Sequence, residues 1–397
     1  MKKNLQSCFF ICISSLFFLS CGNKKEQAQD VSDLTGYPVH IPFEQAVGSE
    51  RDLKLSEIAD SVRFIPLETT DASLMNRIQK GGILKSSRYW FLYSYKNVYQ
   101  FTDEGKFVRT IGSRGNGPGE YTSVACIDID ETLGHVYVLS PGKNINVYDM
   151  ETGSYLYTRK TPSFSSWAFA MLNDSVSACF QYNLSGKEKD RILVAGAEGD
   201  TIRAFSRSDL FDTKTDYVSL VHFDDDRYMF RYKDMVCYKE YYNDTLFVVT
   251  PDSLKPRYVF DLGRYSMPVE HRPEVIGADR KAFESTSSSY IRTQALETDA
   301  WVFMPYCYWQ LKSSAIDDMH LLEVRDGAIL NDMCGNASIP FCPQNVVGSN
   351  ILLSLLPAEK IVEMAEENPS ILKHPQLMEL TEDSNPVLMV VYCKEKV

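Results

Sequence analysis

The chain has 397 residues, of which 44% are hydrophobic and 12% aromatic, and this composition is typical of a globular protein with a sizeable core. The formal net charge of −12, with no cluster of Lys and Arg beyond the first few residues, argues against nucleic acid as a partner. The 23 tyrosines and 21 phenylalanines, beside abundant Val and Ile, favour strands. The length fits one large all-β domain or two ordinary domains.

The first residues have the features of a signal peptide. Lys2 and Lys3 supply positive charge, and residues 8–19 form a mostly apolar run that is too short to span a bilayer. The sequence Phe-Leu-Ser-Cys that ends at Cys21 resembles the lipobox of bacterial lipoproteins, with Phe18 where Leu is commoner. This resemblance implies cleavage before Cys21, lipidation of Cys21, and a cell-envelope protein anchored to the outer membrane on its periplasmic or surface face.

We therefore predict a lipoprotein signal peptide over residues 1–20. Residues 21–45 are predicted to hold the lipidated cysteine and a flexible tether, because the stretch after Cys21 is polar and rich in charge. The folded domain is predicted over residues 46–397. After Cys21 the sequence contains no segment that is long and apolar enough to cross a membrane.

Seven cysteines remain after the leader and lipobox, and none forms a C-x-x-C pair. This odd number argues against a zinc site and against a complete disulfide framework. Cys334 and Cys342 lie in one predicted loop and either pair in an oxidising compartment or remain thiols. The sequence leaves both alternatives open.

Strand patterns begin at residues 61–69, SVRFIPLET, where Pro66 indicates an edge or outer strand because proline cannot donate a ladder hydrogen bond. Short strand-like runs separated by tight turns then follow closely, at residues 78–85, 88–95, 97–101 and 106–112. Four short antiparallel strands with tight turns are typical of one blade of a β-propeller.

The pattern then recurs along the chain. The stretch Phe101–Gly105 is echoed 47 residues later, counted at the aromatic residue, by Tyr148–Gly153. A fainter third copy occupies residues 167–205, and a fourth copy occupies residues 217–263. A period of about 45 to 50 residues is typical of propeller blades.

Two segments interrupt this rhythm. Residues 267–296 read as an insertion with a short helix at residues 278–285, and residues 357–367 read as a second helix with Ile361 and Ala365 on one face. The isolated strands at residues 61–69 and 386–393 are predicted to complete one blade together and close the ring. About 350 structured residues, less the two insertions, predict an all-β fold with six four-stranded antiparallel blades.

The glycine-rich stretch after the strand at residues 107–111 fixes a sharp change of direction. It is not a phosphate loop, because it lacks the G-K-[ST] ending and Glu120 would repel a phosphate. We interpret these glycines as structural.

The chain resembles the six-bladed β-propeller lipoproteins of Bacteroidetes, whose propellers are similar to NHL-type ones. The resemblance is carried by five stretches: Phe18–Cys21, Leu55–Thr69, Ile111–Tyr121, Tyr242–Leu246 with Leu262–Gly263, and Asn385–Leu388. It implies the fold and a location in the envelope, and it implies no activity and no catalytic residues.

Ligands of propellers gather where inner strands and their loops converge at the mouth of the central channel. Arg114, Asn116 and Glu120 are candidate ligand-binding residues there, and the alternative is that they are solvated turn residues. Trp309 is a candidate platform for stacking a sugar, as are its aromatic neighbours and Trp167, although aromatic residues on strands are more often part of a core.

Catalytic and metal-binding patterns are not found in the sequence. The six histidines form no H-x-H or H-E-x-x-H motif, and no G-x-S-x-G motif occurs. Residues 224–226 are three consecutive aspartates, which read as a charged turn more readily than as a calcium loop because the spaced D-x-D-x-D-G pattern is missing. We expect neither a cofactor nor a metal.

Three hypotheses for the function follow. The first is a monomeric, non-enzymatic binding or scaffold protein with a glycan, peptide or protein ligand. The second is a propeller hydrolase or lyase acting on a polysaccharide or lactone through carboxylates or histidines at the channel mouth. The third is a purely structural partner in an envelope complex, which predicts a contiguous apolar patch on the outer rim.

Overall fold

The computed structural model describes residues 36–47, 53–75, 78–79, 82–141, 144–163, 166–183, 185–212, 229–240, 243–272, 285–286, 288–304, 306–308 and 329–395. Cys21, Trp309, the three consecutive aspartates and all but the last residue of the helix predicted at residues 278–285 fall outside these ranges. Within them, none of the helices is long and apolar enough to cross a membrane.

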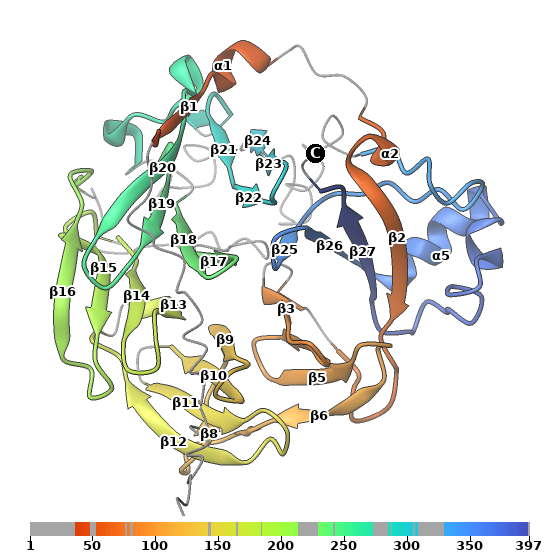
Figure 1. Cartoon of the computed structure of the whole chain (residues 1–397), viewed down its shortest axis with the longest axis horizontal. Helices are drawn as coiled ribbons and strands as arrows, with labels where there is room; N and C mark the ends of the chain where they lie inside the picture. The colour runs from red at the N-terminus through yellow and green to blue at the C-terminus, as the bar shows by residue number, and fades with distance from the viewer. Residues whose placement is uncertain are drawn as a thin grey trace, which may run out of the picture.

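Five four-stranded antiparallel sheets surround a common centre as propeller blades (Figure 1). Blade 1 contains β3 (Leu84–Lys85), β4 (Tyr89–Tyr93), β5 (Val98–Thr102) and β6 (Phe107–Ile111). Blade 2 contains β9 (Cys126–Asp130), β10 (His135–Ser140), β11 (Asn144–Asp149) and β12 (Tyr155–Lys160). Blade 3 contains β13 (Ser166–Met171), β14 (Ser177–Gln181), β15 (Asp190–Ala195) and β16 (Thr201–Ser206).

Of the remaining two blades, only blade 5 combines strands from both ends of the chain. Blade 4 contains β17 (Met229–Tyr232), β18 (Met235–Lys239), β19 (Thr245–Val249) and β20 (Leu254–Phe260). Blade 5 contains β25 (Asn345–Val347), β26 (Ile351–Leu356), β27 (Val387–Cys393) and β2 (Ala59–Pro66). In blades 1 to 4 the first strand in the sequence lies towards the centre of Figure 1 and the last lies at the rim.

The ring is closed as predicted, because the N-terminal strand β2 pairs antiparallel with the C-terminal strand β27. The register runs from Ala59 opposite Cys393 to Pro66 opposite Val387. β2 is the outermost strand of blade 5, which confirms the edge position inferred from Pro66.

The blade count differs from the prediction, since the described residues form five four-stranded blades and not six. Between β20 and β25 lie strands of only two or three residues, which pair as two separate two-stranded ladders. One ladder joins β21 (Ile291–Thr293) to β24 (Tyr306–Tyr308), and the other joins β22 (Leu296–Glu297) to β23 (Val302–Phe303). The count of six assumed that each repeat length yields one complete sheet, whereas the strands described between β20 and β25 have only two or three residues each.

The predicted boundary at residue 46 is also wrong. β1 (Val39–Ile41) pairs in parallel with β20 and adds a fifth strand to the edge of blade 4. The helix α1 (Phe43–Ala46) follows, and its Phe43 is only 5% exposed. Residues from about Tyr37 onward therefore belong to the folded unit and not to the tether.

The core consists of apolar layers between neighbouring blades. Tyr137 of blade 2 shares a buried cluster with Phe169 of blade 3, and the rings of Phe180 in blade 3 and Tyr238 in blade 4 are 5.6 Å apart. Because each blade is covered on both faces, its inner strands read as nearly continuous apolar runs, as β4 does.

Helices are few. α2 (Leu55–Ile58) precedes β2, and α5 (Ala358–Glu367) follows β26 with Ile361 and Ala365 buried, which confirms the helix predicted there. The described residues also contain the single-turn helices η2 (Gly263–Tyr265), η3 (Val269–His271) and η6 (Ile371–Lys373). No disulfide joins Cys334 to Cys342.

Candidate functional site

The glycine-rich loop between blades 1 and 2 is held by its own backbone. β7 (Ser113–Arg114) pairs in parallel with β8 (Glu120–Tyr121), and Gly112 and Gly119 adopt φ of 66° and 71°. The Glu120 carboxylate accepts a hydrogen bond from the Gly117 amide at 2.7 Å. A Cβ at Gly115 would overlap with the Glu120 carboxylate, so Glu120 serves as an internal cap of the loop.

This loop packs against the outer strands of blade 2. The Tyr148 hydroxyl on β11 donates to the Gly119 carbonyl at 2.9 Å, and the Asn146 side-chain amide donates to the Glu120 carbonyl at 2.9 Å. Figure 1 shows β8 beside β12, away from the inner strands. The expected position of this loop at the channel mouth is therefore wrong.

Arg114 and Asn116 are exposed on the same loop, and Arg114 Nε donates to the Thr122 carbonyl at 3.3 Å. The predicted ligand-binding role of Arg114, Asn116 and Glu120 stays a prediction, now for a site on the rim.

The inner strands of three blades are joined by one polar network. Asp128 on β9 accepts from Arg231 on β17, with Nη2 at 2.7 Å and Nε at 3.3 Å. The same carboxylate accepts from the amide of Met171, the last residue of β13, at 2.8 Å, and Arg231 Nη2 donates back to the Met171 carbonyl at 2.6 Å. This arrangement ties blades 2, 3 and 4 together near the centre of the ring.

Burial makes this ion pair strong. Asp128 is 5% exposed, and the Arg231 side chain keeps 34% of its surface exposed. Burial alone would lower the pKa of Arg231, but the charge and the hydrogen bond of Asp128 outweigh it and raise that pKa. Arg231 is thus a permanent cation with one edge fixed to Asp128 and part of its surface left accessible.

The exposed part of the Arg231 side chain is the part of this network that a ligand could contact. Among the described residues, no three His, Cys, Asp or Glu side chains gather in a way that could hold a metal ion. The four described histidines are dispersed: His40 contacts Asp261, His135 contacts Tyr137, His271 lies against Tyr290, and His374 lies against Phe64. An arginine with an accessible surface can donate hydrogen bonds to a carboxylate or carbonyl oxygen.

Asp128 and Arg231 were not singled out from the sequence. The available signal was the strand Ile127-Asp-Ile-Asp130, in which aspartates alternate with isoleucines. Charges that recur on one face of an inner strand indicate polar partners on the facing strands, although the partner itself lies 103 residues away along the chain.

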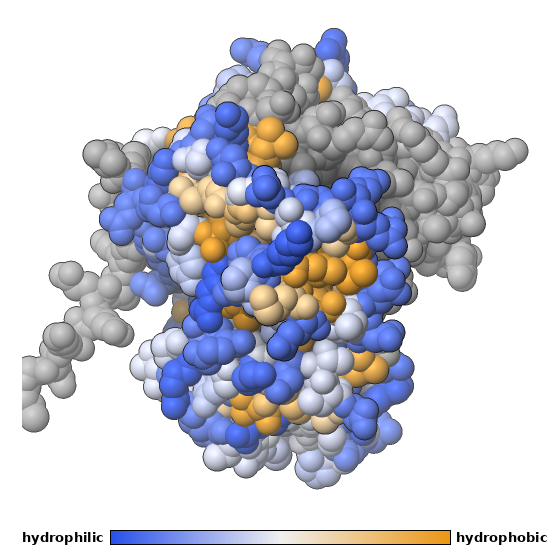
Figure 2. Space-filling model, turned by 90° about the vertical axis from the view of Figure 1, so that its right-hand side faces the viewer, coloured by the Kyte–Doolittle hydropathy of each residue, from blue (hydrophilic) through white to orange (hydrophobic). Residues whose placement is uncertain are grey.

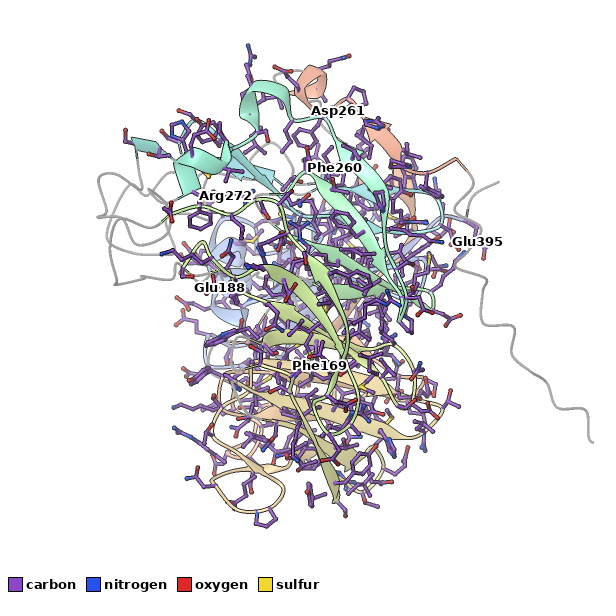
Figure 3. The ribbon with its side chains drawn as sticks, turned by 90° about the vertical axis from the view of Figure 1, so that its left-hand side faces the viewer. Phe169, Glu188, Phe260, Asp261, Arg272 and Glu395 are labelled. Carbon is purple, nitrogen blue, oxygen red and sulfur yellow. The ribbon has the colours of Figure 1, made fainter. Side chains whose placement is uncertain are left out.

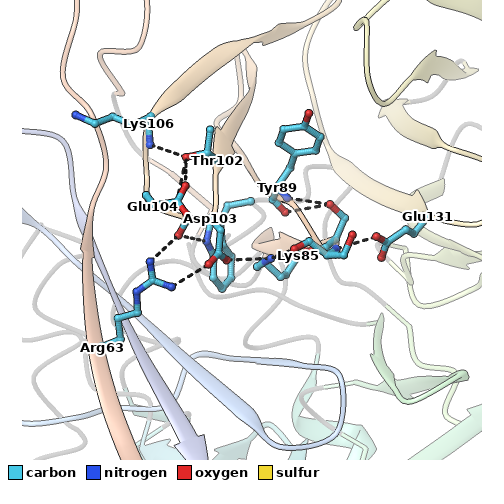
Figure 4. Close-up of polar contacts among 11 residues, drawn as sticks. Arg63, Lys85, Tyr89, Thr102, Asp103, Glu104, Lys106 and Glu131 are labelled. Carbon is cyan, nitrogen blue, oxygen red and sulfur yellow. Dashed lines mark hydrogen bonds and ion pairs between the residues drawn. The ribbon is translucent and has the colours of Figure 1, made fainter.

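A second polar junction lies where blade 5 meets blade 1 (Figure 4). Asp103, in the turn after β5, pairs with Arg63 of β2 at 2.9 Å and with Lys85 of β3 at 3.0 Å. Burial acts to raise the pKa of Asp103, but the hydrogen bonds from Arg63 and Lys85 outweigh it and lower that pKa. The junction stabilises the closure of the ring.

The outer rim carries apolar side chains in several places. Exposed apolar residues on the outermost strand β12 are Tyr155, Leu156 and Tyr157, and Ile202 is exposed on β16. On the α5 side of the molecule, Figure 2 shows separate apolar patches among hydrophilic side chains. Scattered apolar residues of this kind are normal on a protein surface, so they do not by themselves indicate a partner.

Comparisons with known proteins bear on the fold. The model of a family described as "Domain of unknown function (DUF4934)" matches residues 38–392. The crystal structure of a "Putative exported protein" from Bacteroides fragilis is similar, with a TM-score of 0.65 at 16% identity over 87% of this chain and 98% of that one. At this identity the likeness shows the fold alone.

Two weaker likenesses carry no argument. A protein of unknown function from Bacteroides caccae has a TM-score of 0.25 at 12% identity, covering 32% of this chain and 50% of its own. The Pan2 WD40 domain of Neurospora crassa has a TM-score of 0.30 at 9% identity, covering 52% and 57%. No relative was found among curated proteins. The resemblance to NHL-type propellers stays a prediction.

Proposed function

We propose that this chain, which belongs to the family described as "Domain of unknown function (DUF4934)", is a lipid-anchored envelope protein that acts as a binding or scaffold module. It binds a glycan, peptide or protein ligand as a monomer. The proposal combines the propeller fold with the lipobox-like sequence that ends at Cys21. A propeller fold alone does not identify a ligand, so the support must come from particular residues.

The observation that carries the binding role is the Asp128–Arg231 pair. The buried carboxylate of Asp128 already accepts hydrogen bonds from the Arg231 guanidinium and from the Met171 amide, so it is not available as a general acid or base. The 34% of the Arg231 side chain that remains exposed is available to a ligand. A rigid ring with an accessible arginine favours recognition over catalysis.

The test uses a soluble form that begins at Gly36, so that β1 is kept. This protein is incubated with a panel of host and dietary glycans while melting temperature and released products are recorded together. A specific rise in melting temperature without product supports binding, because a ligand stabilises only the state that it binds. The variant Arg231→Gln should lose that rise, whereas Arg203→Gln, which changes a half-exposed arginine on β16, should keep it.

Release of product from the panel would overturn the binding role and support the hydrolase or lyase hypothesis. A rise that survives in Arg231→Gln would show that the ligand binds elsewhere. The absence of both signals would favour a structural partner in an envelope complex.

Anchoring is tested separately in cells. The variant Cys21→Ala should move the protein from the membrane fraction to the soluble fraction, since it lacks the thiol that would carry the lipid. Cys12→Ala, within the leader, is the matched control and should leave the protein with the membrane. Membrane retention of Cys21→Ala would exclude the lipid anchor.

A further inference from the structure

The glycine-rich loop on the rim contains the only Asn-Gly pair of the sequence, Asn116-Gly117. Both residues are exposed. In Figure 3 the tan ribbons of blades 1 and 2, which this loop connects, form the lower end of the molecule, opposite the labelled Phe260 and Asp261, where β1 covers the edge of blade 4. Water therefore reaches the pair, and β1 lies at the far end of the molecule.

An Asn-Gly pair can modify itself, because asparagine is thermolabile and glycine has no Cβ to shield its backbone nitrogen. The glycine nitrogen loses its proton and attacks the asparagine Cγ, and the new N–C bond closes a succinimide ring. The bond from Cγ to the side-chain nitrogen breaks, and this nitrogen leaves with the proton as ammonia. Water then opens the ring to aspartate or isoaspartate. The net exchange is water for ammonia, so the reaction requires no oxidant, reductant or cofactor.

The proton that must leave Gly117 is already held by an acceptor. The Gly117 amide donates to the Glu120 carboxylate at 2.7 Å. A hydrogen bond to a charged group is about twice as strong as one between neutral groups. Loss of the proton would also create a second negative charge beside the carboxylate, and neighbouring like charges disfavour ionisation. Glu120 therefore opposes the first step of the reaction.

The backbone on both sides of Asn116 is held as well. The amide of Gly115 donates to the Tyr121 carbonyl at 3.0 Å, and the amide of Glu120 donates to the Gly117 carbonyl at 3.0 Å. These hydrogen bonds oppose rotation about the backbone of Asn116, through which the Gly117 nitrogen would approach the Asn116 side chain. The conformation of the loop and the charge of Glu120 thus act in the same direction.

We propose that Asn116 is a latent deamidation site and that Glu120 controls its rate. While the Glu120 carboxylate holds the Gly117 amide, conversion is slow; once this contact is lost, Asn116 is the first asparagine of the folded chain to convert. Either product adds a negative charge to a loop that already holds Glu120, and isoaspartate also inserts a carbon into the backbone between β7 and β8. Conversion therefore alters the rim loop irreversibly. This inference goes beyond the proposed function and does not depend on it.

The chain that begins at Gly36 is kept at mildly alkaline pH, either folded or in urea, and the peptide that contains Asn116 is followed by mass spectrometry. Exchange of the amide for an acid changes the mass of this peptide, and chromatography separates aspartate from isoaspartate. The folded chain should convert about tenfold more slowly than the chain in urea, because only the folded chain has the hydrogen bond to Glu120.

The test variants are Glu120→Ala and Glu120→Gln. Glu120→Ala removes both the acceptor and its charge, so the folded variant should convert about tenfold faster than folded wild type. Glu120→Gln keeps an acceptor oxygen without the charge. A wild-type rate in Glu120→Gln would assign the control to the hydrogen bond, and the rate of Glu120→Ala would assign it to the charge.

Two further variants are the controls. Glu104→Ala removes an exposed carboxylate from the turn between β5 and β6 and should convert at the wild-type rate. Addition of Gly117→Ala to Glu120→Ala should slow conversion again, because the new Cβ shields the attacking nitrogen. The melting temperature of every variant is recorded first, and each is incubated well below it, so that loss of the fold does not account for a faster rate.

The inference is overturned if folded wild type converts at Asn116 as fast as the chain in urea. It is also overturned if Glu120→Ala leaves the rate at Asn116 unchanged, or if another asparagine of folded Glu120→Ala converts first.

Discussion

Single residues at the blade junctions combine two requirements that only glycine meets. Gly105, Gly153 and Gly199 each lie in the turn before the outermost strand of a blade, with φ of 82°, 72° and 81°. Each also faces the outermost strand of the preceding blade. A Cβ at Gly153 would lie 2.9 Å from Arg109 Cδ, and one at Gly199 would lie 3.0 Å from Lys160 Cβ. The repeated glycine therefore sets both the turn and the distance between blades.

The variant Gly105→Ala should separate these two effects when it is compared with Gly134→Ala. Both sites have a positive φ, but a Cβ at Gly105 would overlap with the Pro66 carbonyl, whereas one at Gly134 meets nothing within 4 Å. We expect Gly134→Ala to lower the free energy of unfolding by about 1 kcal/mol and Gly105→Ala by about 1–3 kcal/mol more. Urea denaturation measures both, and equal losses would contradict the role of Gly105 in blade contact.

The Asp128–Arg231 pair should behave as a buried ion pair. Arg231→Met leaves the charge of Asp128 buried and unpaired, so it should lower the free energy of unfolding by about 3–5 kcal/mol, whereas Asp128→Asn leaves the partly exposed charge of Arg231 and should lower it by less. The double variant should lose less than the sum, because it leaves no unpaired charge. Additive losses in this double-mutant cycle would show that the pair is not coupled.

At the scale of elements, the edge of blade 4 determines which residue is the first of the folded unit. The outermost strand β20 is covered by β1, so its backbone groups are paired and are not left at an open edge. The guanidinium of Arg257 on β20 lies 4.6 Å from the centre of the Tyr37 ring, and its two carboxylate contacts are to Glu297 of β22. The N-terminal segment thus fixes blade 4 and the short ladder beside it.

Truncation should locate this boundary. A chain that begins at Gly36 should unfold at the same denaturant midpoint as a chain that begins at Cys21. A chain that begins at Gly48 should lose about 2–3 kcal/mol from the burial of Phe43 and about 1 kcal/mol from the contact of Tyr37 with Arg257. Equal stability of both truncated chains would instead support the boundary predicted from sequence.

At the scale of the whole molecule, ring closure connects residues that are more than 300 positions apart. β2 supplies the last strand of blade 5, and its Ile65 shares a buried cluster with Trp90 of blade 1 and Leu388 of β27. Each blade buries its faces against its two neighbours, so the removal of one blade exposes two apolar layers. A destabilising substitution at the ring closure should therefore lower the stability of the whole ring.

Phe64→Ala tests this coupling, since Phe64 lies on β2 with 1% of its surface exposed. The loss should be about 3–5 kcal/mol, and far-UV circular dichroism and tryptophan fluorescence should still report one coincident transition. Ser61→Ala, at an exposed position on the same strand, should leave the midpoint nearly unchanged. Two separate transitions in Phe64→Ala would show that blade 5 unfolds independently of the ring.

Much of this architecture could be predicted because it depends on local patterns. Alternating apolar residues and turn signals identified the strands of the first four blades, and Pro66 placed β2 at an edge. The helix at residues 358–367 followed from the spacing of Ile361 and Ala365. The binding residues could not be predicted in the same way, because Asp128 and Arg231 meet only when β9 and β17 converge at the centre.

By itself, the sequence determined the class of fold, the strands and the pairing of the two terminal segments, because hydrophobic periodicity and turn chemistry act over a few residues. Tertiary structure alone decided that β1 joins blade 4, that the described strands form five complete blades, and that the loop of Arg114 and Glu120 lies on the rim. These features depend on which strand ends meet in space, and spacing along a chain does not encode that distance.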